Sequence, residues 1–147
     1  MTKTTNYIIF EFLSRSANEG FARSAVAAFA AQLDPTLEEL GDIKTAVSEA
    51  VTNAIVHAYP DTLGRIVVKA KILEGNVLEI SVRDWGRGIP DVEQAHQPLY
   101  TTGGEERSGM GFTIMESFMD KLSVRSAEGK GTKVTMRRRI LPRPAGK

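Results

Sequence analysis

Three short runs carry most of the information in this sequence: SEAVTNA at residues 48–54, DWGRG at residues 84–88 and RSGMG at residues 107–111. The first places an acid, Glu49, four residues before an amide, Asn53. The second places another acid, Asp84, directly before a turn that contains two glycines. Either glycine run alone is weak evidence, so the meaning of the set depends on the elements that carry it.

The composition is that of an ordinary globular domain. The 147 residues are 41% hydrophobic and 25% charged, and the net charge of +1 gives no overall field that favours nucleic acid or an anionic membrane. The absence of cysteine excludes disulfides, a thiol nucleophile and thiolate metal sites. No apolar run approaches the length of a membrane span or leads from the N-terminus into a signal peptide. We expect one cytoplasmic domain over residues 1–140 and a disordered tail over residues 141–147.

Apolar patterns in the first part of the chain predict a strand and two helices. Residues 7–13 favour the strand. The run SANE at residues 16–19 fits a capping box that opens a helix ending near Leu33. The run TLEE at residues 36–39 fits a second capping box, which opens a longer helix ending near Tyr59.

The longer helix has two different faces. Glu49, Asn53 and His57 follow one another at i, i+4 and i+8 on one side. For a single helix, a solvated polar face is the more common explanation of such a row. The largely opposite side carries an apolar stripe that we expect in the core, namely Leu40, Ile43, Val47, Val51, Ala54 and Ala58.

The rest of the chain predicts two hairpins with a loop and a helix between them. Residues 89–108 lack clean periodicity, and a loop of this length inside a compact domain usually has a function, often as a lid. A helix is expected at residues 111–119, and strands at residues 65–73, 77–84, 122–126 and 133–139. This order predicts an α+β fold, a two-layer sandwich in which a mixed, mostly antiparallel sheet carries helices on one face.

The DWGRG run is expected at the end of a strand, where it could recognise a base. There the Asp84 carboxylate can accept a hydrogen bond from an exocyclic amine such as that of adenine. Gly86 and Gly88 let the backbone turn tightly and approach a flat ring. A simple turn explains the same residues, because Asp and Gly are common in turns.

The third run is expected at the start of a helix, where it could bind phosphate. Free N–H groups and the helix dipole favour an anion there, and the glycines Gly109 and Gly111 allow close approach. Arg107 and Ser108 could add a cation and a hydroxyl group. The hinge of a lid needs glycine equally.

The acid and the amide of the first run suit phosphoryl transfer. The Asn53 amide oxygen is a suitable ligand for Mg²⁺, which otherwise keeps water molecules and takes phosphate oxygens. A carboxylate such as Glu49 beside it can orient or deprotonate an attacking hydroxyl group. The three runs together therefore predict an ATP site.

Other kinds of site have less support. His57 and His96 are the only histidines, and no acid–His spacing suggests a zinc site. No nucleophile elbow and no Walker sequence is present. The basic run at residues 137–139 could contact an acidic partner, although such a run at a strand end is more often solvated. Trp85 could stack on a base, or it could pack beside the turn.

The motifs resemble those of the Bergerat-type ATP-binding fold, which gyrase B, Hsp90, histidine kinases and MutL share. EAVTNA at residues 49–54 is similar to its N box, and GTK at residues 131–133 to its closing Gly-Thr element. DWGRG and the glycines at residues 109–111 are similar to its two glycine boxes.

Within that superfamily the chain most resembles the anti-sigma F factors of sporulating bacteria. The stretches that carry this resemblance are NEGFAR at residues 18–23, QLDPT at residues 32–36, PLYTT at residues 98–102 and ERSGMGFTIME at residues 106–116. The resemblance implies a homodimeric serine kinase that uses ATP and Mg²⁺. It would phosphorylate an anti-anti-sigma protein and would bind and inhibit a sporulation sigma factor, without direct contact to nucleic acid or membrane.

The resemblance also implies a role for each site residue by position. Glu49 would be the general base and Asn53 the Mg²⁺ ligand, and Arg23 would be a candidate contact to the sigma factor or the substrate. Asp84 would recognise the adenine amine. The base would be surrounded by Gly86, Gly88 and Thr132, and the phosphates would be held by Arg107, Ser108, Gly109, Met110 and Gly111.

Two alternative functions stay open, and the sequence differs from the family at one place. A module that binds ATP and sequesters a partner without phosphoryl transfer would have no need of an acid at Glu49, which separates it from a kinase. A detached histidine-kinase catalytic domain fits less well. The lid sequence departs from the family at Gly103 and Gly104, where a lysine and a proline are expected, and this change predicts a more mobile lid without a lysine contact to phosphate.

Overall fold

The structure, a computed structural model of the chain, describes residues 2–88 and 106–141, with the side chains of residues 106–111 left undescribed. Its elements follow in the order β1 (Thr4–Leu13), α1 (Asn18–Ala30), the 3₁₀ turn η1 (Ala31–Leu33), α2 (Leu37–Asn53), the π-helical turn η2 (Ala54–Ala58), β2 (Arg65–Leu73), β3 (Val77–Asp84), α4 (Glu106–Phe118), β4 (Lys121–Ala127) and β5 (Gly131–Arg139).

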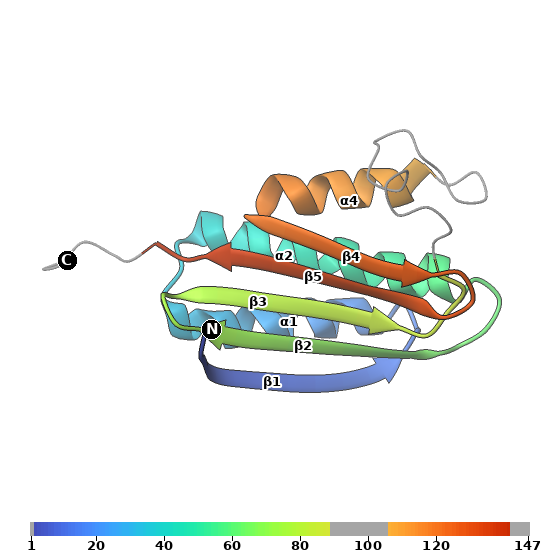
Figure 1. The fold of residues 1–147 in the computed structure, drawn as a ribbon, viewed down its shortest axis with the longest axis horizontal. Helices are drawn as coiled ribbons and strands as arrows, with labels where there is room; N and C mark the ends of the chain where they lie inside the picture. The colour runs from blue at the N-terminus through green and yellow to red at the C-terminus, as the bar shows by residue number, and fades with distance from the viewer. Residues whose placement is uncertain (1, 89–105, 142–147) are drawn as a thin grey trace, which may run out of the picture.

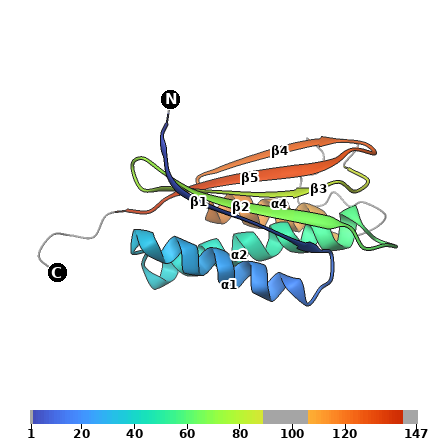
Figure 2. The same cartoon turned by 90° about the horizontal axis from the view of Figure 1, so that it is seen from below.

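The strands form one sheet in the order β1-β2-β3-β5-β4, and every neighbouring pair is antiparallel. The helices lie together on one face of this sheet, and the other face carries none of the described helices (Figure 1, Figure 2). Helix α2 packs between α1 and α4. The prediction of an α+β sandwich with helices on one face is confirmed, and the described strands contain no parallel pair.

The core lies between the sheet and the helices. Along β2 and β3 alternate side chains are buried against the helices, as a period of two residues requires. The stripe expected on α2 is largely confirmed, because Ile43, Val47 and Val51 are fully buried, and Leu40 packs against the core from a half-buried position. Burial of each such side chain stabilises the fold by about 1.5–3 kcal/mol.

The two predicted capping boxes have different outcomes. At the start of α2 the Glu39 N–H donates to the Thr36 hydroxyl (3.0 Å) and the Thr36 N–H donates to the Glu39 carboxylate (2.8 Å), which confirms the second box. The first box is wrong. Helix α1 begins at Asn18 with Ala17 as its N-cap and no capping side chain, because the Glu19 carboxylate instead bonds Arg23 and the Ser48 hydroxyl of α2.

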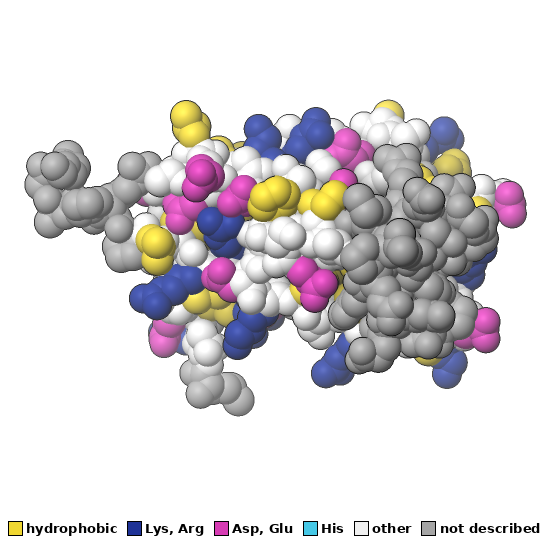
Figure 3. Space-filling model, turned by 90° about the horizontal axis from the view of Figure 1, so that it is seen from above, with side chains coloured by type: hydrophobic (Ala, Val, Ile, Leu, Met, Phe, Trp, Pro, Cys, Tyr) yellow, Lys and Arg dark blue, Asp and Glu magenta, His cyan; other side chains and the backbone are white. Residues whose placement is uncertain are grey.

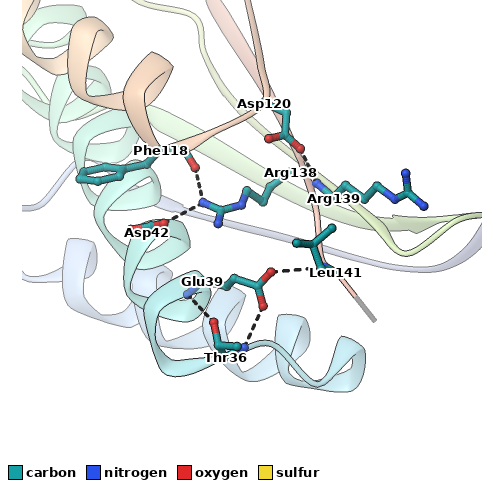
Figure 4. A network of polar contacts seen from close by, with 8 residues as sticks. All are labelled: Thr36, Glu39, Asp42, Phe118, Asp120, Arg138, Arg139 and Leu141. Atoms are coloured by element: carbon teal, nitrogen blue, oxygen red, sulfur yellow. Dashed lines mark hydrogen bonds and ion pairs between the residues drawn. The ribbon is translucent and has the colours of Figure 1, made fainter. Parts of the chain in front are cut away.

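A polar network fixes the N-terminal end of α2 to the end of β5 (Figure 4). The second oxygen of Glu39 accepts the Leu141 N–H at 3.2 Å. Arg138 donates to the Asp42 carboxylate at 2.8 Å and to the Phe118 carbonyl at 2.6 Å. Burial alone would raise the pKa of Glu39, but hydrogen bonds from Thr36 and Leu141, together with the Arg138 charge, hold that pKa below its ordinary value.

Some predicted boundaries shift or lie outside the described residues. Helix α4 begins at Glu106 rather than at residue 111, so the run 107–111 lies within its first two turns instead of preceding it. His96, the lid glycines Gly103 and Gly104, and the tail beyond Leu141 are outside the described residues. The single domain over residues 1–140 stays a prediction. Within the described residues, no helix has the length and apolar character needed to cross a membrane.

Candidate functional site

A pocket lies where α2 passes into η2, beside the ends of β3 and β5. Its walls are largely apolar with a few polar groups, which is the usual character of a small-molecule site. The lining residues are Ala50, Asn53, Ala54, His57, Ala58, Val82, Asp84, Arg87, Gly88, Phe112, Thr132 and Val134.

The Asp84 carboxylate is the main polar group of this pocket. Its side chain is at the end of β3 and only 5% of the residue is exposed. One oxygen accepts the N–H groups of Gly86 (3.0 Å) and Thr132 (3.2 Å), and the other has no hydrogen bond to a described residue. Burial raises the pKa of Asp84 against the lowering effect of these two N–H groups. The carboxylate is thus held in place with one acceptor oxygen left for a ligand.

Asn53, the last residue of α2, supplies a second unfilled polar group. Its Nδ2 atom is buried and has no hydrogen-bond partner among the described residues. A buried polar group without a partner costs about 1–3 kcal/mol, and native structures contain few of them. Because Asn53 lines the pocket, a ligand bound there would offset this cost.

The π-helical turn η2 was not expected from the sequence. Residues that were predicted to continue a regular helix, Ala54–Ala58, form a π-turn, and such turns are frequent at functional sites. The Ala58 carbonyl at its end accepts the Arg87 N–H at 3.2 Å. The turn brings His57 and Ala58 to the pocket wall. A period near 3.6 residues does not distinguish this turn from an α-helix.

The glycines of the DWGRG run allow three backbones to meet. A Cβ atom at Gly86 would collide with the Ala58 carbonyl, and one at Gly88 would collide with the Ala127 carbonyl. Gly88 also has a φ of +76°, which side chains rarely tolerate. The run is therefore held between the end of η2 and the β4–β5 hairpin. The close approach that requires glycine here is to the protein's own backbone.

Tyr59 supports the same turn from outside the pocket, and sequence reasoning missed it. Its hydroxyl accepts the Trp85 N–H at 2.7 Å and donates to the Arg65 carbonyl at 2.8 Å. Burial raises the pKa of Tyr59. The Trp85 ring does not line the pocket, and the guanidinium groups of Arg65 and Arg83 lie over it, at 3.9 and 4.7 Å from the ring centre. Of the two alternatives for Trp85, the structure therefore agrees with packing beside the turn.

The remaining predicted residues are placed differently. Thr132 lines the pocket, and its hydroxyl lies 2.8 Å from that of Ser126. Glu49 is half-buried on α2, one turn before Asn53, and is not among the lining residues. The phosphate contacts expected from residues 107–111 stay a prediction, because their side chains are outside the described set.

Arg23 lies on α1 and joins it to α2. Its Nη1 atom is 3.2 Å from the Glu19 carboxylate and 3.3 Å from the Ser48 hydroxyl, which itself donates to Glu19 at 2.6 Å. Ser48 immediately precedes Glu49. Arg23 is therefore tied to the turn of α2 that carries the proposed base.

The described residues contain no group of three or more His, Cys, Asp or Glu side chains that could hold a metal ion. Of the polar residues that line the pocket, Asn53 is the one expected to bind Mg²⁺, through its amide oxygen. Mg²⁺ that arrives with a nucleotide takes most of its ligands from phosphates and water, so a single amide oxygen suits it.

Sequence comparisons give relatives over most of the chain. A model of the histidine kinase-like ATPase domain matches residues 12–138. The anti-sigma F factor of Thermoanaerobacter sp. (strain X514) is 59% identical over 137 residues, with 92% of this chain and 95% of the relative covered. That of Caldanaerobacter subterraneus subsp. tengcongensis is 60% identical over 136 residues (92% and 94%), and that of Geobacillus kaustophilus is 57% identical over 136 residues (92% and 93%).

Solved structures share the fold. A structure of RsbU and RsbW domains from Mycobacterium tuberculosis matches with a TM-score of 0.68 and 22% identity, covering 92% of this chain and 32% of that one. The histidine kinase domain of a blue-light activated kinase from Erythrobacter litoralis matches with a TM-score of 0.55 and 25% identity, covering 83% of this chain and 61% of that one.

Proposed function

We propose, because the chain belongs to the anti-sigma F factor family and has its histidine kinase-like ATPase domain, that it is an ATP-dependent serine kinase. We propose that it also inhibits a sigma factor. Its substrate would be a serine of an anti-anti-sigma protein. The inhibited protein would be a sporulation sigma factor, and the active form a homodimer.

The observation that carries this proposal is the open oxygen of Asp84. The Gly86 and Thr132 N–H groups fix one carboxylate oxygen, so the other has a defined direction and no competing donor among the described residues. The adenine amine supplies such a donor. Val82 and Val134 of the same pocket offer apolar surface to the base.

The Asn53 amide oxygen would hold Mg²⁺ beside the nucleotide phosphates, and its Nδ2 group, which has no partner among the described residues, would donate to a nucleotide oxygen. Mg²⁺ would offset the negative charge of those phosphates. Asn53 is held for this task by its position as the last residue of α2, directly before the π-turn.

For the transfer itself, Glu49 would accept the proton of the substrate serine. The serine oxygen would form a bond to the γ-phosphorus as the bond from phosphorus to the bridging oxygen breaks, and ADP would leave with that electron pair. Glu49 stands one helical turn before Asn53, about 5–6 Å away between Cβ atoms. The N–H groups at the start of α4 would face the phosphates.

One observation favours the alternative of a nucleotide-gated binding module. Glu49 is not among the residues that line the pocket, so ATP could bind without contact to this carboxylate. In such a module ATP would shape a surface for the sigma factor, and no phosphate would move.

Incubation with γ-labelled ATP and the candidate anti-anti-sigma protein separates the two functions. The kinase proposal expects label on a serine of that protein. Formation of an ATP-dependent complex that carries no label would support the binding module. Serine-to-alanine substitution in the partner is the control, since it should remove label and leave binding intact.

A further inference from the structure

The outer face of the sheet, which points away from the helices, is strongly basic. Figure 1 looks onto this face, and Figure 2 shows that the described helices lie on the other side. The acids among its outward side chains are Glu11 and Glu79. The basic residues are Arg65, Lys69, Lys71, Arg83, Lys121, Arg125, Lys133, Arg137 and Arg139.

This concentration of cations contrasts with the net charge of the whole chain and with the surface seen from the side of α4. The whole chain has a net charge of only +1. The view from the side of α4 shows basic, acidic and apolar side chains intermingled, with no one type dominant (Figure 3). The arginine run at residues 137–139 contributes to the contrast, because Arg137 and Arg139 point outward while Arg138 turns inward to Asp42.

Within this face, Arg83, Lys133 and Arg125 form a continuous line that we call the cation row. Arg83 pairs with Lys133 across β3 and β5, and Lys133 pairs with Arg125 across β5 and β4. No acid of the described residues forms an ion pair with any of the three. Like charges directly opposite each other on neighbouring strands destabilise a sheet. The cation row therefore costs stability in the isolated chain.

In a second line of charged residues on the same face, the cations form ion pairs with an acid. Glu79 lies 2.7 Å from Arg137 and 3.9 Å from Lys71, so one acid serves two cations. The row of pairs between the two lines carries Ser81, Thr135 and Ser123 instead. Lys69, Lys121 and Arg139 on this face also form no ion pair with a described acid, but only in the cation row do three such cations stand directly opposite one another on neighbouring strands.

The surface beside the cation row is hollowed on both sides. Two open depressions share Arg125 and Lys133 as lining residues. One adds the cations Lys121 and Arg137 and the acid Glu79, and the other adds the cations Arg83 and Lys130 and the acid Asp84.

We propose that the cation row and its two depressions bind an acidic segment of a partner protein. Carboxylates of that segment would provide the neutralising charges that the chain itself does not place there. A second copy of this chain does not fit as the occupant, because a two-fold interface on this face would bring the same cations against each other. This site goes beyond the proposed kinase and sigma-inhibitor activities.

Single-stranded nucleic acid fits the face less well than a peptide does. Surfaces that bind such strands combine cations with aromatic rings on which bases stack. Tyr7 and Trp85 are the outward aromatic side chains of the described strands and their ends, and each already has a cation over its ring. Carboxylates need no free ring.

The spacing suits a helical segment. Arg125 and Lys121 are four residues apart along β4, which is about 13 Å in a strand. Acids eight residues apart along a helix are separated by about 12 Å. The nucleotide pocket is adjacent to this site, because Asp84 and Thr132 line both that pocket and one of the two depressions.

The test uses the full chain and a fluorescent oligo-glutamate peptide of about 12 residues, long enough to span both depressions. Fluorescence anisotropy at physiological salt measures its dissociation constant. We expect Arg125→Glu with Lys133→Glu to raise that constant about tenfold or more, and added salt to raise it for the wild type. The exchange Arg125→Lys with Lys133→Arg keeps the charges and should keep the affinity.

The matched control places the same change of charge on the other side of the molecule. Arg15→Glu with Lys44→Glu alters two exposed cations outside the sheet face and should change the constant less than about twofold. Circular dichroism and ATP affinity verify that each variant is folded. Equal weakening by both double variants, no weakening by the first, or tighter binding of an oligothymidylate of equal charge would overturn the proposal.

Discussion

Helix α2 has a buried carboxylate near each end, and the two differ in how much of their hydrogen-bonding capacity the protein itself fills. Glu39 at the N-terminal end is 7% exposed, and both of its oxygens accept N–H groups. Asp84, beside the C-terminal end, is 5% exposed and has one oxygen filled. Asn53, at the same end, has a buried Nδ2 atom without a partner. One end completes the fold, and the other leaves polar groups for a ligand.

The pKa values of the two acids also differ, and the acid with fewer hydrogen bonds has the raised pKa. Hydrogen bonds outweigh burial at Glu39 and lower its pKa, whereas burial outweighs hydrogen bonds at Asp84 and raises its pKa. The pKa directions differ because Glu39 has more donors and the Arg138 charge beside it, whereas Asp84 lies deeper in the protein and has two N–H donors. A buried acid whose donors are incomplete is the better candidate for a binding site.

The largest effect is expected at the site end of α2, from Glu49→Gln. Loss of the proposed base should lower the rate of phosphoryl transfer by about 10²–10⁴-fold. ATP affinity should change little, because Glu49 does not line the pocket. Single-turnover transfer and calorimetric titration with ATP measure the two quantities. The control is Glu38→Gln, an exposed acid of the same helix, and an unchanged rate in Glu49→Gln would exclude Glu49 as the base.

At the other end, Glu39→Ala should lower the free energy of unfolding by about 2 kcal/mol. The change removes a capping box and leaves the Leu141 N–H without its acceptor. ATP affinity should stay at the wild-type value. Urea unfolding with Glu38→Ala as control tests this. A loss of ATP affinity in the folded variant would contradict the claim that the Glu39 end serves stability alone.

Asn53→Ala should leave the unliganded protein as stable as the wild type or more stable by up to about 1 kcal/mol. The substitution removes a buried group without a partner and adds a better helix former. The affinity for ATP in the presence of Mg²⁺ should fall. Clear destabilisation of the unliganded variant would mean that Asn53 serves the fold rather than a ligand.

The smallest effects are two acid transitions. The contribution of Glu39 to stability is complete above its unfolded pKa, near 4.5, and is lost as the pH falls through its lower folded pKa. Asp84 has a pKa raised above 3.8, so its acceptor is lost at a higher pH than in an ordinary Asp. The difference in stability between the wild type and Glu39→Ala should therefore shrink only below pH 4.5, and ATP affinity should have its acid midpoint above pH 3.8. Titrations of both quantities against pH measure this, and an affinity midpoint below 3.8 would contradict the role of Asp84.

Local signals were sufficient for much of the fold. The capping box at Thr36 was predictable because both of its hydrogen bonds lie within four residues. The same pattern at Ser16 failed because Glu19 has partners on another helix, Ser48 among them. The exact strands of the first hairpin followed from alternation and a turn signal, since burial on one face imposes a period of two.

The candidate site was predictable as a set of residues but not as an arrangement. Residue types and the family resemblance identified Asn53, Asp84 and Thr132, which the fold brings to one pocket. The π-turn at η2 and the support from Tyr59 had no sequence signal, because both depend on contacts between segments far apart in the chain. The cation row likewise becomes visible only when the register places residues of three strands side by side.

The most direct test of the account is the ATP and GTP affinity of the wild type and of Asp84→Asn. We predict that the wild type prefers ATP by about 100-fold or more, because the open Asp84 oxygen accepts the adenine amine and repels the guanine carbonyl. In Asp84→Asn the retained oxygen still accepts the Gly86 and Thr132 N–H groups, while a donor faces the adenine amine. ATP affinity should therefore fall about 10–100-fold with the fold intact. Equal affinity of the wild type for ATP and GTP, or unchanged ATP binding by Asp84→Asn, would contradict it.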